Sequence, residues 1–207
     1  SLDEQLKQAD ALHAQEDING TFTLLEKLDK ENNSNEPEVT WRLARVHYLL
    51  AKEAVSDAAK RESHMRTAMT LIEKAYAAKK DSFAINKWFG ILLGSMGEFI
   101  STKEKIGNAW KIKEFFDKAL ELKPDDATTW HALGVWSWNV YNIGFMERGI
   151  ASALFATPPS ATVDDCEKCF MKSFELFPGD VANCLKLGDV YYAKKDWKEA
   201  KRFYTLA

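Results

Sequence analysis

The chain has 207 residues and a mass of 23.5 kDa, which suits one large domain or two small ones. With 46% hydrophobic and 29% charged residues, it is neither a disordered nor a fibrous protein. The formal net charge of −3 excludes a globally basic nucleic-acid binder, because neutralising phosphates requires a surplus of cations. Residues 41–123, with 16 basic against 10 acidic side chains, form the only net-positive third of the chain.

Three cysteines, Cys166, Cys169 and Cys184, lie in one carboxyl-terminal stretch. An odd number cannot form a complete disulfide framework, so these residues indicate a reducing compartment. Cys166 and Cys169 have the spacing of a zinc or redox pair, but no second pair accompanies them. We therefore expect neither a metal site nor a cofactor.

The amino terminus has neither the basic cluster nor the apolar run of a signal peptide. Residues 127–146 contain no Asp, Glu, Lys or Arg, and these 20 residues would be long enough to span a bilayer. Polar side chains such as Thr128, His131 and Asn139 interrupt the stretch. A buried helix is therefore expected there rather than a transmembrane segment.

Helix-forming residues dominate the chain, and no stretch alternates apolar and polar residues over several positions, which predicts an all-α fold. The chain should begin with a capping hairpin over residues 1–31, with helices at Leu2–Ala14 and Ile18–Lys30. The prolines are expected at helix boundaries: Pro37, Pro124, Pro158, Pro159 and Pro178. Acidic residues should cap the helices that follow: Asp125, Asp126, Asp164 and Asp165.

Four stretches match parts of the tetratricopeptide pattern, which is W-x2-L-G-x2-Y followed by A-x3-F and then P. The first helix of the first unit carries Trp41-x2-Ala44-Arg45-x2-Tyr48, and that of the second carries Phe89-Gly90-x2-Leu93. The third unit has Trp130-x2-Leu133-Gly134 followed by Cys166-x3-Phe170. The fourth has Leu187-Gly188-x2-Tyr191 followed by Ala200-x3-Tyr204.

The four repeat units begin near residues 38, 83, 127 and 181, so each spacing exceeds the 34 residues of the pattern. The excess lies between the landmarks of the first and second helices, which predicts extended helices or connections. The sequence thus predicts one tetratricopeptide-like helical domain over residues 1–207. The alternative is an irregular helical bundle whose spacings match by chance.

The first helix of each unit should line a concave surface, and the repeat frame predicts which side chains face it. We call these residues the predicted groove: Arg42, Lys87, His131, Val46, Ile91, Val135, Trp138 and Tyr192. Two firm cations, a titratable histidine and an apolar floor suit an anionic group on an apolar body. Such a ligand is either an acidic, partly hydrophobic peptide or an anionic phospholipid. The alternatives are that the aromatic residues fill core and that the cations form a solvated face.

Catalytic motifs are weak throughout. His13, His47 and His64 fall on different predicted helices without a serine or acid constellation around them. Gly90-x3-Gly94-x2-Gly97 lacks the Gly-Lys-Ser/Thr element of a phosphate-binding loop and is better explained by close helix packing. We therefore expect a binding protein and not an enzyme.

The segment 150–162 reads Ile-Ala-Ser-Ala-Leu-Phe-Ala-Thr-Pro-Pro-Ser-Ala-Thr. Together with the acidic helix start that follows it and with Trp41-Arg42-Leu43-Ala44-Arg45, it resembles the regulator of microtubule dynamics family, in its first, invertebrate-type branch. The likeness extends over most of the chain and makes this segment the family's own insertion in the third unit. The residues that carry it are Ser152, Ala153, Leu154, Phe155, Pro158 and Pro159.

The resemblance implies a non-enzymatic protein of the cytoplasm and spindle that associates with microtubules and supports chromosome segregation. A larger relative is the tyrosine-phosphatase-interacting protein at mitochondrial contact sites, a membrane-anchored tether whose similar domain binds phospholipids. This relative implies the alternative to microtubule association, namely that the domain binds anionic phospholipid at an organelle membrane surface. The chain shows no phenylalanine-based tether motif, so tethering is not expected.

Four lysines offer a basic surface: Lys103, Lys105, Lys111 and Lys113. Because the exposed tails of tubulin are acidic, these lysines are predicted to attract them through screened charge interactions. Microtubules, tubulin and spindle proteins are therefore the expected partners, with no nucleic acid.

Overall fold

A computed structural model describes all 207 residues, and the regular secondary structure of the chain is helical, with no strand. The all-α, tetratricopeptide-like prediction is confirmed. The helices in chain order are α1 (Leu2–Ala14), α2 (Ile18–Glu31), α3 (Pro37–Glu53), α4 (Ala58–Ala78), α5 (Phe83–Ser95), the 3-10 helix η1 (Met96–Glu98), α6 (Thr102–Gly107), α7 (Ala109–Leu122), α8 (Ala127–Tyr141), α9 (Phe145–Leu154), α10 (Val163–Leu176), α11 (Val181–Ala193) and α12 (Trp197–Leu206). None of them combines the length with the apolar character that crossing a bilayer requires.

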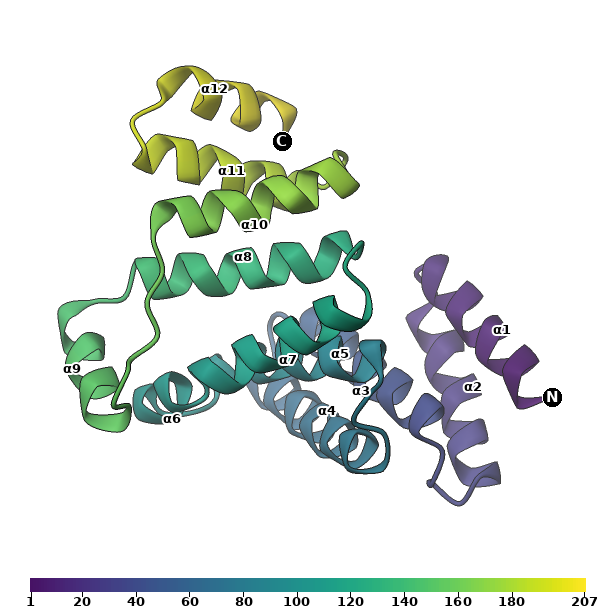
Figure 1. Ribbon diagram of the computed structural model, residues 1–207. Coiled ribbons are helices and arrows are strands. Elements are labelled where there is room, and N and C mark those ends of the chain that lie inside the picture. Colours follow the sequence, from purple (N-terminus) through teal and green to yellow (C-terminus); the bar gives the residue numbers. More distant parts are fainter. The chain divides into compact units, whose positions relative to one another are not determined.

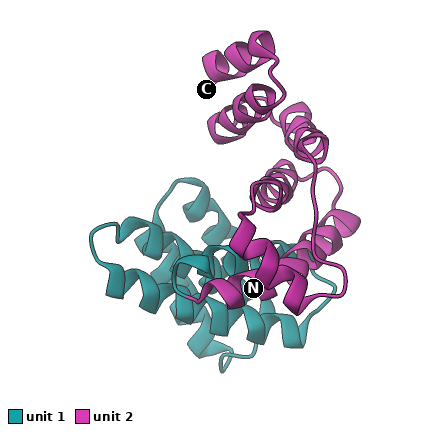
Figure 2. Ribbon diagram, turned by 90° about the vertical axis from the view of Figure 1, so that its left-hand side faces the viewer, with its two compact units in different colours: residues 1–99 teal, residues 100–207 magenta.

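The helices group into two compact units, residues 1–99 with α1 to α5 and residues 100–207 with α6 to α12 (Figure 2). In unit 2, α8, α10, α11 and α12 lie one beside the next (Figure 1). In unit 1, α3 packs along α4, and the hairpin of α1 and α2 continues the series through α2 against α3. That the whole chain acts as one domain stays a prediction.

Helix boundaries follow the local chemistry that the sequence shows. The expected repeat starts at 83, 127 and 181 coincide with the first residues of α5, α8 and α11, and α3 begins one residue earlier than expected, at Pro37. Asp126 caps α8, its carboxylate accepting from the Thr129 backbone N–H at 2.8 Å. Asp165 instead stands in the first turn of α10, where it completes a capping box with Thr162.

The repeats exceed 34 residues for different reasons. In the first, α3 and α4 are themselves long, at 17 and 21 residues. In the second, η1 and α6 are inserted between α5 and α7, and in the third, α9 and an extended segment stand between α8 and α10. Extended helices therefore account for one repeat and extended connections, which contain added short helices, account for the other two.

Each unit has its own apolar core. In unit 1, Leu25, Leu28 and Val39 are fully buried between α2 and α3. In unit 2, Phe170 and Phe203 are fully buried, and the Phe203 ring stacks on Tyr191 at 5.5 Å. Burying side chains of this size stabilises each unit by about 1.5–3 kcal/mol per residue.

The last two hairpins of unit 2 share one register. A methyl group on Gly134 would lie 2.6 Å from the Phe170 ring, and one on Gly188 would lie 2.3 Å from the Tyr204 ring. Each glycine thus lets the second helix approach closely. The helix caps Thr162 of α10 and Asp196 of α12 keep the same 34-residue offset that separates Phe170 from Tyr204. A residue of α10 is therefore equivalent to the residue of α12 that lies 34 positions later.

Candidate functional site

The predicted groove is divided between the two units. Unit 1 contains Arg42 and Val46 on α3 and Lys87 and Ile91 on α5, whereas unit 2 contains His131, Val135 and Trp138 on α8 and Tyr192 on α11. That all of them line one groove stays a prediction. The surroundings of each residue can be described within its own unit.

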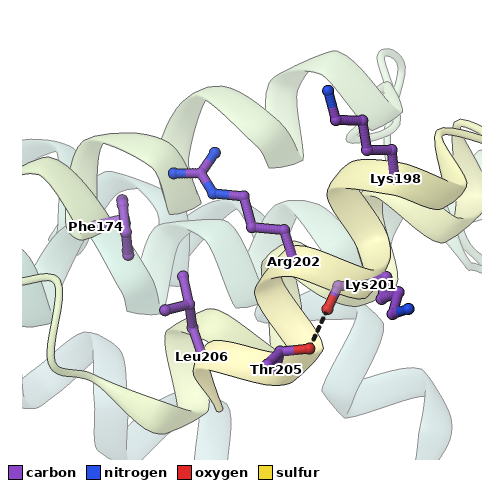
Figure 3. Close-up of a pocket in the computed structure, with 6 residues that line it drawn as sticks. All are labelled: Phe174, Lys198, Lys201, Arg202, Thr205 and Leu206. Carbon is purple, nitrogen blue, oxygen red and sulfur yellow. Dashed lines mark hydrogen bonds between the residues drawn. The ribbon is translucent and has the colours of Figure 1, made fainter.

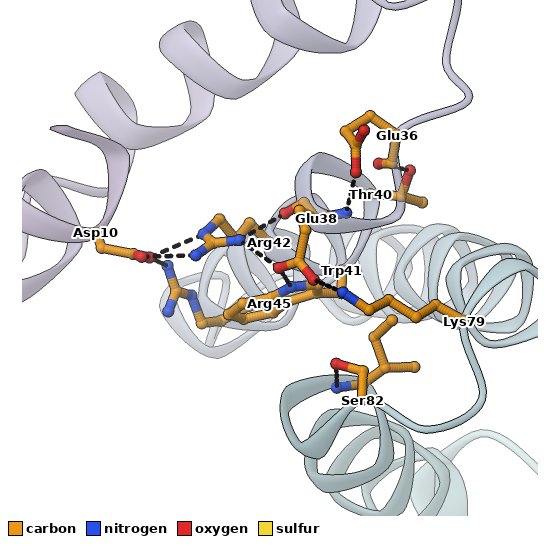
Figure 4. Close-up of polar contacts among 10 residues, drawn as sticks. Asp10, Glu36, Glu38, Thr40, Trp41, Arg42, Arg45, Lys79 and Ser82 are labelled. Atoms are coloured by element: carbon orange, nitrogen blue, oxygen red, sulfur yellow. Dashed lines mark hydrogen bonds and ion pairs between the residues drawn. The ribbon is translucent and has the colours of Figure 1, made fainter. Parts of the chain in front are cut away.

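Arg42 is held in an ion-pair cluster inside unit 1 (Figure 4). Its guanidinium contacts both oxygens of Asp10 on α1, at 3.0 and 2.7 Å, and one oxygen of Glu38 at 3.0 Å. The side chain is 11% exposed and lies over the Trp41 ring. Two carboxylates therefore neutralise Arg42, which leaves it a structural cation instead of a free anion-binding group.

Arg45 and Lys79 complete the same cluster. Arg45 contacts Asp10 at 3.1 Å and is 8% exposed, and Lys79 contacts Glu38 at 2.8 Å. Burial would raise the pKa of the Asp10 carboxyl, but its hydrogen bonds and charge interactions with Arg42 and Arg45 outweigh burial and lower that pKa. The cluster joins α1, α3 and the end of α4, and so it serves the fold.

The other predicted groove residues of unit 1 are apolar or partly covered. Val46 is fully buried and packs in the core with α1 and α2. Ile91 is half-buried on α5, as is Lys87, whose ammonium lies 5.6 Å from the Phe83 ring centre. Val46 therefore cannot form the floor of an open surface, which corrects the expectation for that residue.

In unit 2, three of the predicted groove residues contribute to packing between helices. The His131 Nδ1 atom lies 2.9 Å from the Asn183 side-chain oxygen, and the Asn183 amide donates to the Phe170 carbonyl at 2.9 Å. Val135 and Trp138 pack against the cluster around Phe170 and Phe203. Tyr192 is 60% exposed and meets the Trp197 ring edge-on at 5.1 Å.

The predicted basic surface lies on α6 and α7. Three of its lysines are exposed: Lys103, Lys105 and Lys111. Lys113 is half-buried, pairs with Asp117 at 2.6 Å, and lies 6.0 Å from the centre of the Trp136 ring. Between residues 100 and 113 the only acidic residue is Glu104, so this stretch keeps a local positive charge.

The segment around Pro158 and Pro159 forms the end of α9 and the extended connection to α10. Ser152, Ala153 and Leu154 end the helix, and Phe155 begins the extended part. The Trp110 indole donates to the Thr157 carbonyl at 3.1 Å, and α9 packs against α6. The segment therefore braces α6 and α7, which carry the exposed lysines.

A second basic surface, which the sequence analysis missed, lies on α12. An open depression of about 570 Å³ is lined by Phe174, Lys198, Lys201, Arg202, Thr205 and Leu206 (Figure 3). No carboxylate lies within ion-pair distance of Lys198 or Lys201, whereas Arg202 pairs with Glu199 at 2.8 Å. Phe174 and Leu206 make one side of the depression apolar, so the surface combines free cations with an apolar contact.

A family model described as "Regulator of microtubule dynamics protein 1-3" matches residues 5–207. The chain belongs to this family.

Similar curated proteins carry the same name. Regulator of microtubule dynamics protein 1 of Bos taurus is 33% identical over all of this chain and 64% of its own length. The Mus musculus protein 1 is 34% identical over 99% of this chain and 66% of its own length, and the Mus musculus protein 3 is 35% identical over 91% and 39%. The chain thus spans less than two thirds of the curated relatives that it matches.

Solved structures of tetratricopeptide proteins share the fold of this family member. A thermophilic TPR protein of Thermus thermophilus superimposes with a TM-score of 0.67 over 99% of this chain and 89% of its own, at 15% identity. PilF of Pseudomonas aeruginosa gives a TM-score of 0.64 over 99% of this chain and 73% of its own, also at 15% identity. At this identity the likeness shows the fold alone.

In this member of the regulator of microtubule dynamics family, an alignment of the repeat units would have revealed the basic surface on α12. The carboxyl-terminal third, residues 124–207, has 9 basic against 11 acidic side chains, and this balance conceals a local cluster of cations. Aligning α10 with α12 exposes it, because Asp164 and Glu167 become Lys198 and Lys201.

Proposed function

We propose that this chain is a non-enzymatic, microtubule-associated helical-repeat module that supports spindle organisation and chromosome segregation. Membership of a family whose members are named regulators of microtubule dynamics supports a microtubule-related role. The helical-repeat fold supports a role in binding, since such arrays present extended surfaces to partners. The chain then works in the cytoplasm, on the cytoskeleton and spindle.

The observation that carries the proposal is the set of exposed lysines on α6 and α7. Lys103, Lys105 and Lys111 are exposed, and Glu104 is the only acidic residue in the stretch from residue 103 to residue 111. The tails of tubulin are acidic, and opposite charges at a protein surface raise the rate and strength of encounter. Such contacts lie in water and are screened within about 8 Å at physiological salt.

Co-pelleting with stabilised microtubules over a salt series tests this proposal. The triple variant Lys103→Glu, Lys105→Glu, Lys111→Glu should bind about ten-fold or more weakly at low salt, because attraction becomes repulsion. Wild-type binding should fall as salt rises, and should also fall on microtubules whose acidic tails have been removed by proteolysis. The variant Lys198→Glu, Lys201→Glu is the matched control, since it reverses lysines on α12 instead.

Equal pelleting of the wild-type chain and the triple variant at low salt would contradict the role of these lysines. Binding that persists unchanged at high salt would contradict the electrostatic account as a whole. A circular-dichroism melt of each variant confirms that the helices are intact.

Anionic phospholipid binding in the predicted groove is the alternative function. It requires Arg42 and Lys87 to present charge to a phosphate group. Since Asp10 and Glu38 already neutralise Arg42, the surroundings of that residue favour the microtubule proposal. Organic extraction and mass spectrometry of the purified chain would reveal a retained phospholipid, and that result would favour the alternative.

A further inference from the structure

The connection between α9 and α10 presents a threonine hydroxyl to solvent. Residues 155–162 form this connection, which leaves α9 beside α6, the helix on which α9 packs (Figure 1). Residues 156–161 make no hydrogen bond between backbone groups, and the Trp110 indole donates to the Thr157 carbonyl at 3.1 Å. The Thr157 side chain is exposed, and its hydroxyl makes no hydrogen bond within the chain. This hydroxyl is therefore accessible, and little backbone structure resists its entry into the cleft of an enzyme.

The residue that follows Thr157 narrows the class of enzyme. Thr157 is the only serine or threonine of the chain that a proline follows directly. The ring of Pro158 disfavours the helical region for Thr157, so the threonine keeps the extended kind of backbone that protein kinases bind. Proline-directed kinases accept this neighbour because proline brings no backbone N–H into a pocket that offers no acceptor. Exposure, extended backbone and a following proline thus coincide at one hydroxyl.

The same hydroxyl lies beside the basic surface of α6 and α7. Trp110, whose indole contacts Thr157, is followed directly on α7 by the exposed Lys111. Between residues 100 and 113, four lysines stand against Glu104 alone, which gives this stretch a net charge of +3. Phosphothreonine carries a charge of about −1.5 to −2 at pH 7. One phosphate on Thr157 would therefore offset at least half of the charge of the basic surface.

We propose that a proline-directed protein kinase phosphorylates Thr157, and that the phosphate weakens the binding of acidic segments, those of tubulin among them, to the lysines of α6 and α7. In the transfer, the Thr157 hydroxyl oxygen bonds to the γ-phosphorus of ATP, and the bond from that phosphorus to the oxygen bridging to the β-phosphate breaks. ADP leaves, and the hydroxyl proton passes to a base of the kinase. The regulatory part rests on the microtubule function proposed above, whereas the modification itself does not.

Incubation of the purified chain with ATP and a mitogen-activated protein kinase tests the modification. Mass spectrometry of the intact chain and of its peptides should find one phosphate, on Thr157. Thr157→Ala should remove it, and Pro158→Ala should slow its addition about ten-fold or more, although the hydroxyl remains. Ser160→Ala is the matched control, because Ser160 is exposed in the same connection but precedes Ala161. This control should be phosphorylated like the wild-type chain.

Co-pelleting with microtubules at low salt tests the regulation. The phosphorylated chain should bind about five-fold more weakly than the unmodified chain, and the difference should shrink as salt rises. In the neutral variant Lys103→Gln, Lys105→Gln, Lys111→Gln, the phosphate should have little further effect, because the two changes act on the same charges. Beads that carry poly-L-glutamate provide a parallel assay without tubulin, and their retention of the chain should fall in the same way.

The outcomes separate this inference from the microtubule function. Phosphate on residues other than Thr157, or equal phosphorylation of the Pro158→Ala variant, would overturn the modification. Full phosphorylation of Thr157 that changes neither pelleting nor retention, while the neutral lysine variant loses both, would overturn the regulation and leave the microtubule function standing. If phosphorylation lowers retention on poly-L-glutamate but no form of the chain pellets with microtubules, the microtubule function fails and the effect of the phosphate on the basic surface stands.

Discussion

Arg42 and Arg45 on α3 and Lys198 and Lys201 on α12 are two pairs of cations on repeat helices, but their surroundings are opposite. The arginines are 11% and 8% exposed and are joined to Asp10, and Arg42 also contacts Glu38. The lysines are exposed and have no carboxylate partner. The cations of unit 1 therefore hold helices together, whereas those of unit 2 are available to a partner.

The reason for the difference is desolvation. A guanidinium taken out of water needs counterions and hydrogen bonds, and α1 supplies them to α3 through Asp10. An exposed lysine keeps its water and needs no counterion within the chain. A cation at a repeat position that is expected to face a groove can thus be either a buried structural cation or an exposed free one. The burial of its side chain decides between the two.

The largest expected effect concerns the buried side of this comparison. Arg42→Met should lower the free energy of unfolding by about 2 kcal/mol, because Asp10 and Glu38 lose a partner while Asp10 stays partly solvated. Urea unfolding followed by circular dichroism measures it. Arg66→Met is the matched control, since Arg66 is 56% exposed and pairs only with surface groups, and it should cost less than about 0.5 kcal/mol. Equal losses for the two variants would contradict a structural role for the cluster.

A second test compares the inner hairpin of unit 2 with the terminal one. Gly134→Ala should lower the free energy of unfolding by about 1–2 kcal/mol, because its methyl group meets the fully buried Phe170 ring. Gly188→Ala meets the Tyr204 ring, which is 40% exposed and can move outward, so the change should stay within about 0.5 kcal/mol. Thermal unfolding of both variants measures the two losses of stability. A larger loss in Gly188→Ala than in Gly134→Ala would show that α12 is held as rigidly as α10.

The third prediction concerns pH and the interior of unit 1. The Nδ1 atoms of His47 on α3 and His64 on α4 lie 3.0 Å apart, and burial, followed by the charge of His64, lowers the pKa of His47 to about 4. The unfolded chain therefore takes up a proton near pH 6.5 that the folded chain does not take up until about pH 4. Stability should fall as the pH drops from 7 to 5.

His47→Gln tests the pH prediction directly. Urea unfolding at pH 7 and pH 5 should show a smaller loss of stability in the variant than in the wild-type chain. Burial also lowers the pKa of His13, so a part of the loss should remain. An unchanged pH dependence in His47→Gln would assign the effect to other groups.

The smallest effect belongs to the exposed side of the comparison. Lys198→Glu, Lys201→Glu should change the free energy of unfolding by less than about 0.5 kcal/mol, because neither lysine has a partner to lose. Urea unfolding of the variant and of the wild-type chain measures this change. A large loss of stability would show that these lysines serve the fold in the way that Arg42 does.

Much of the fold could be predicted because the signals are local. The landmarks of the repeat pattern placed the starts of α5, α8 and α11 at their observed positions, and small residues in that pattern, such as Gly134 and Gly188, marked the close helix contacts. The inserted helices α6 and α9 were not predicted as such. Each is short and lies inside an expected connection, where length alone does not distinguish a loop from a helix.

The candidate site was harder to predict because it depends on contacts between distant residues. Nothing near Arg42 in the sequence indicates Asp10, which lies 32 positions earlier and reaches it only when α1 packs beside α3. Val46 looked like a groove residue because the repeat frame assigns a face to each position. In unit 1, the hairpin of α1 and α2 covers that face of α3. The repeat frame does not include this hairpin, so it could not predict that Val46 is buried.

The sequence by itself determined the helical class, the repeat register and, through its inserted segment, the likeness to the family. These properties follow from short-range chemistry, namely helix propensity, capping and the spacing of residues along one helix. Only the tertiary structure decided which cations are free. The reason is that availability depends on burial and counterions, and both come from helices that the chain brings together across long separations, as Asp10 meets Arg42, or leaves uncovered, as at Lys198 and Lys201.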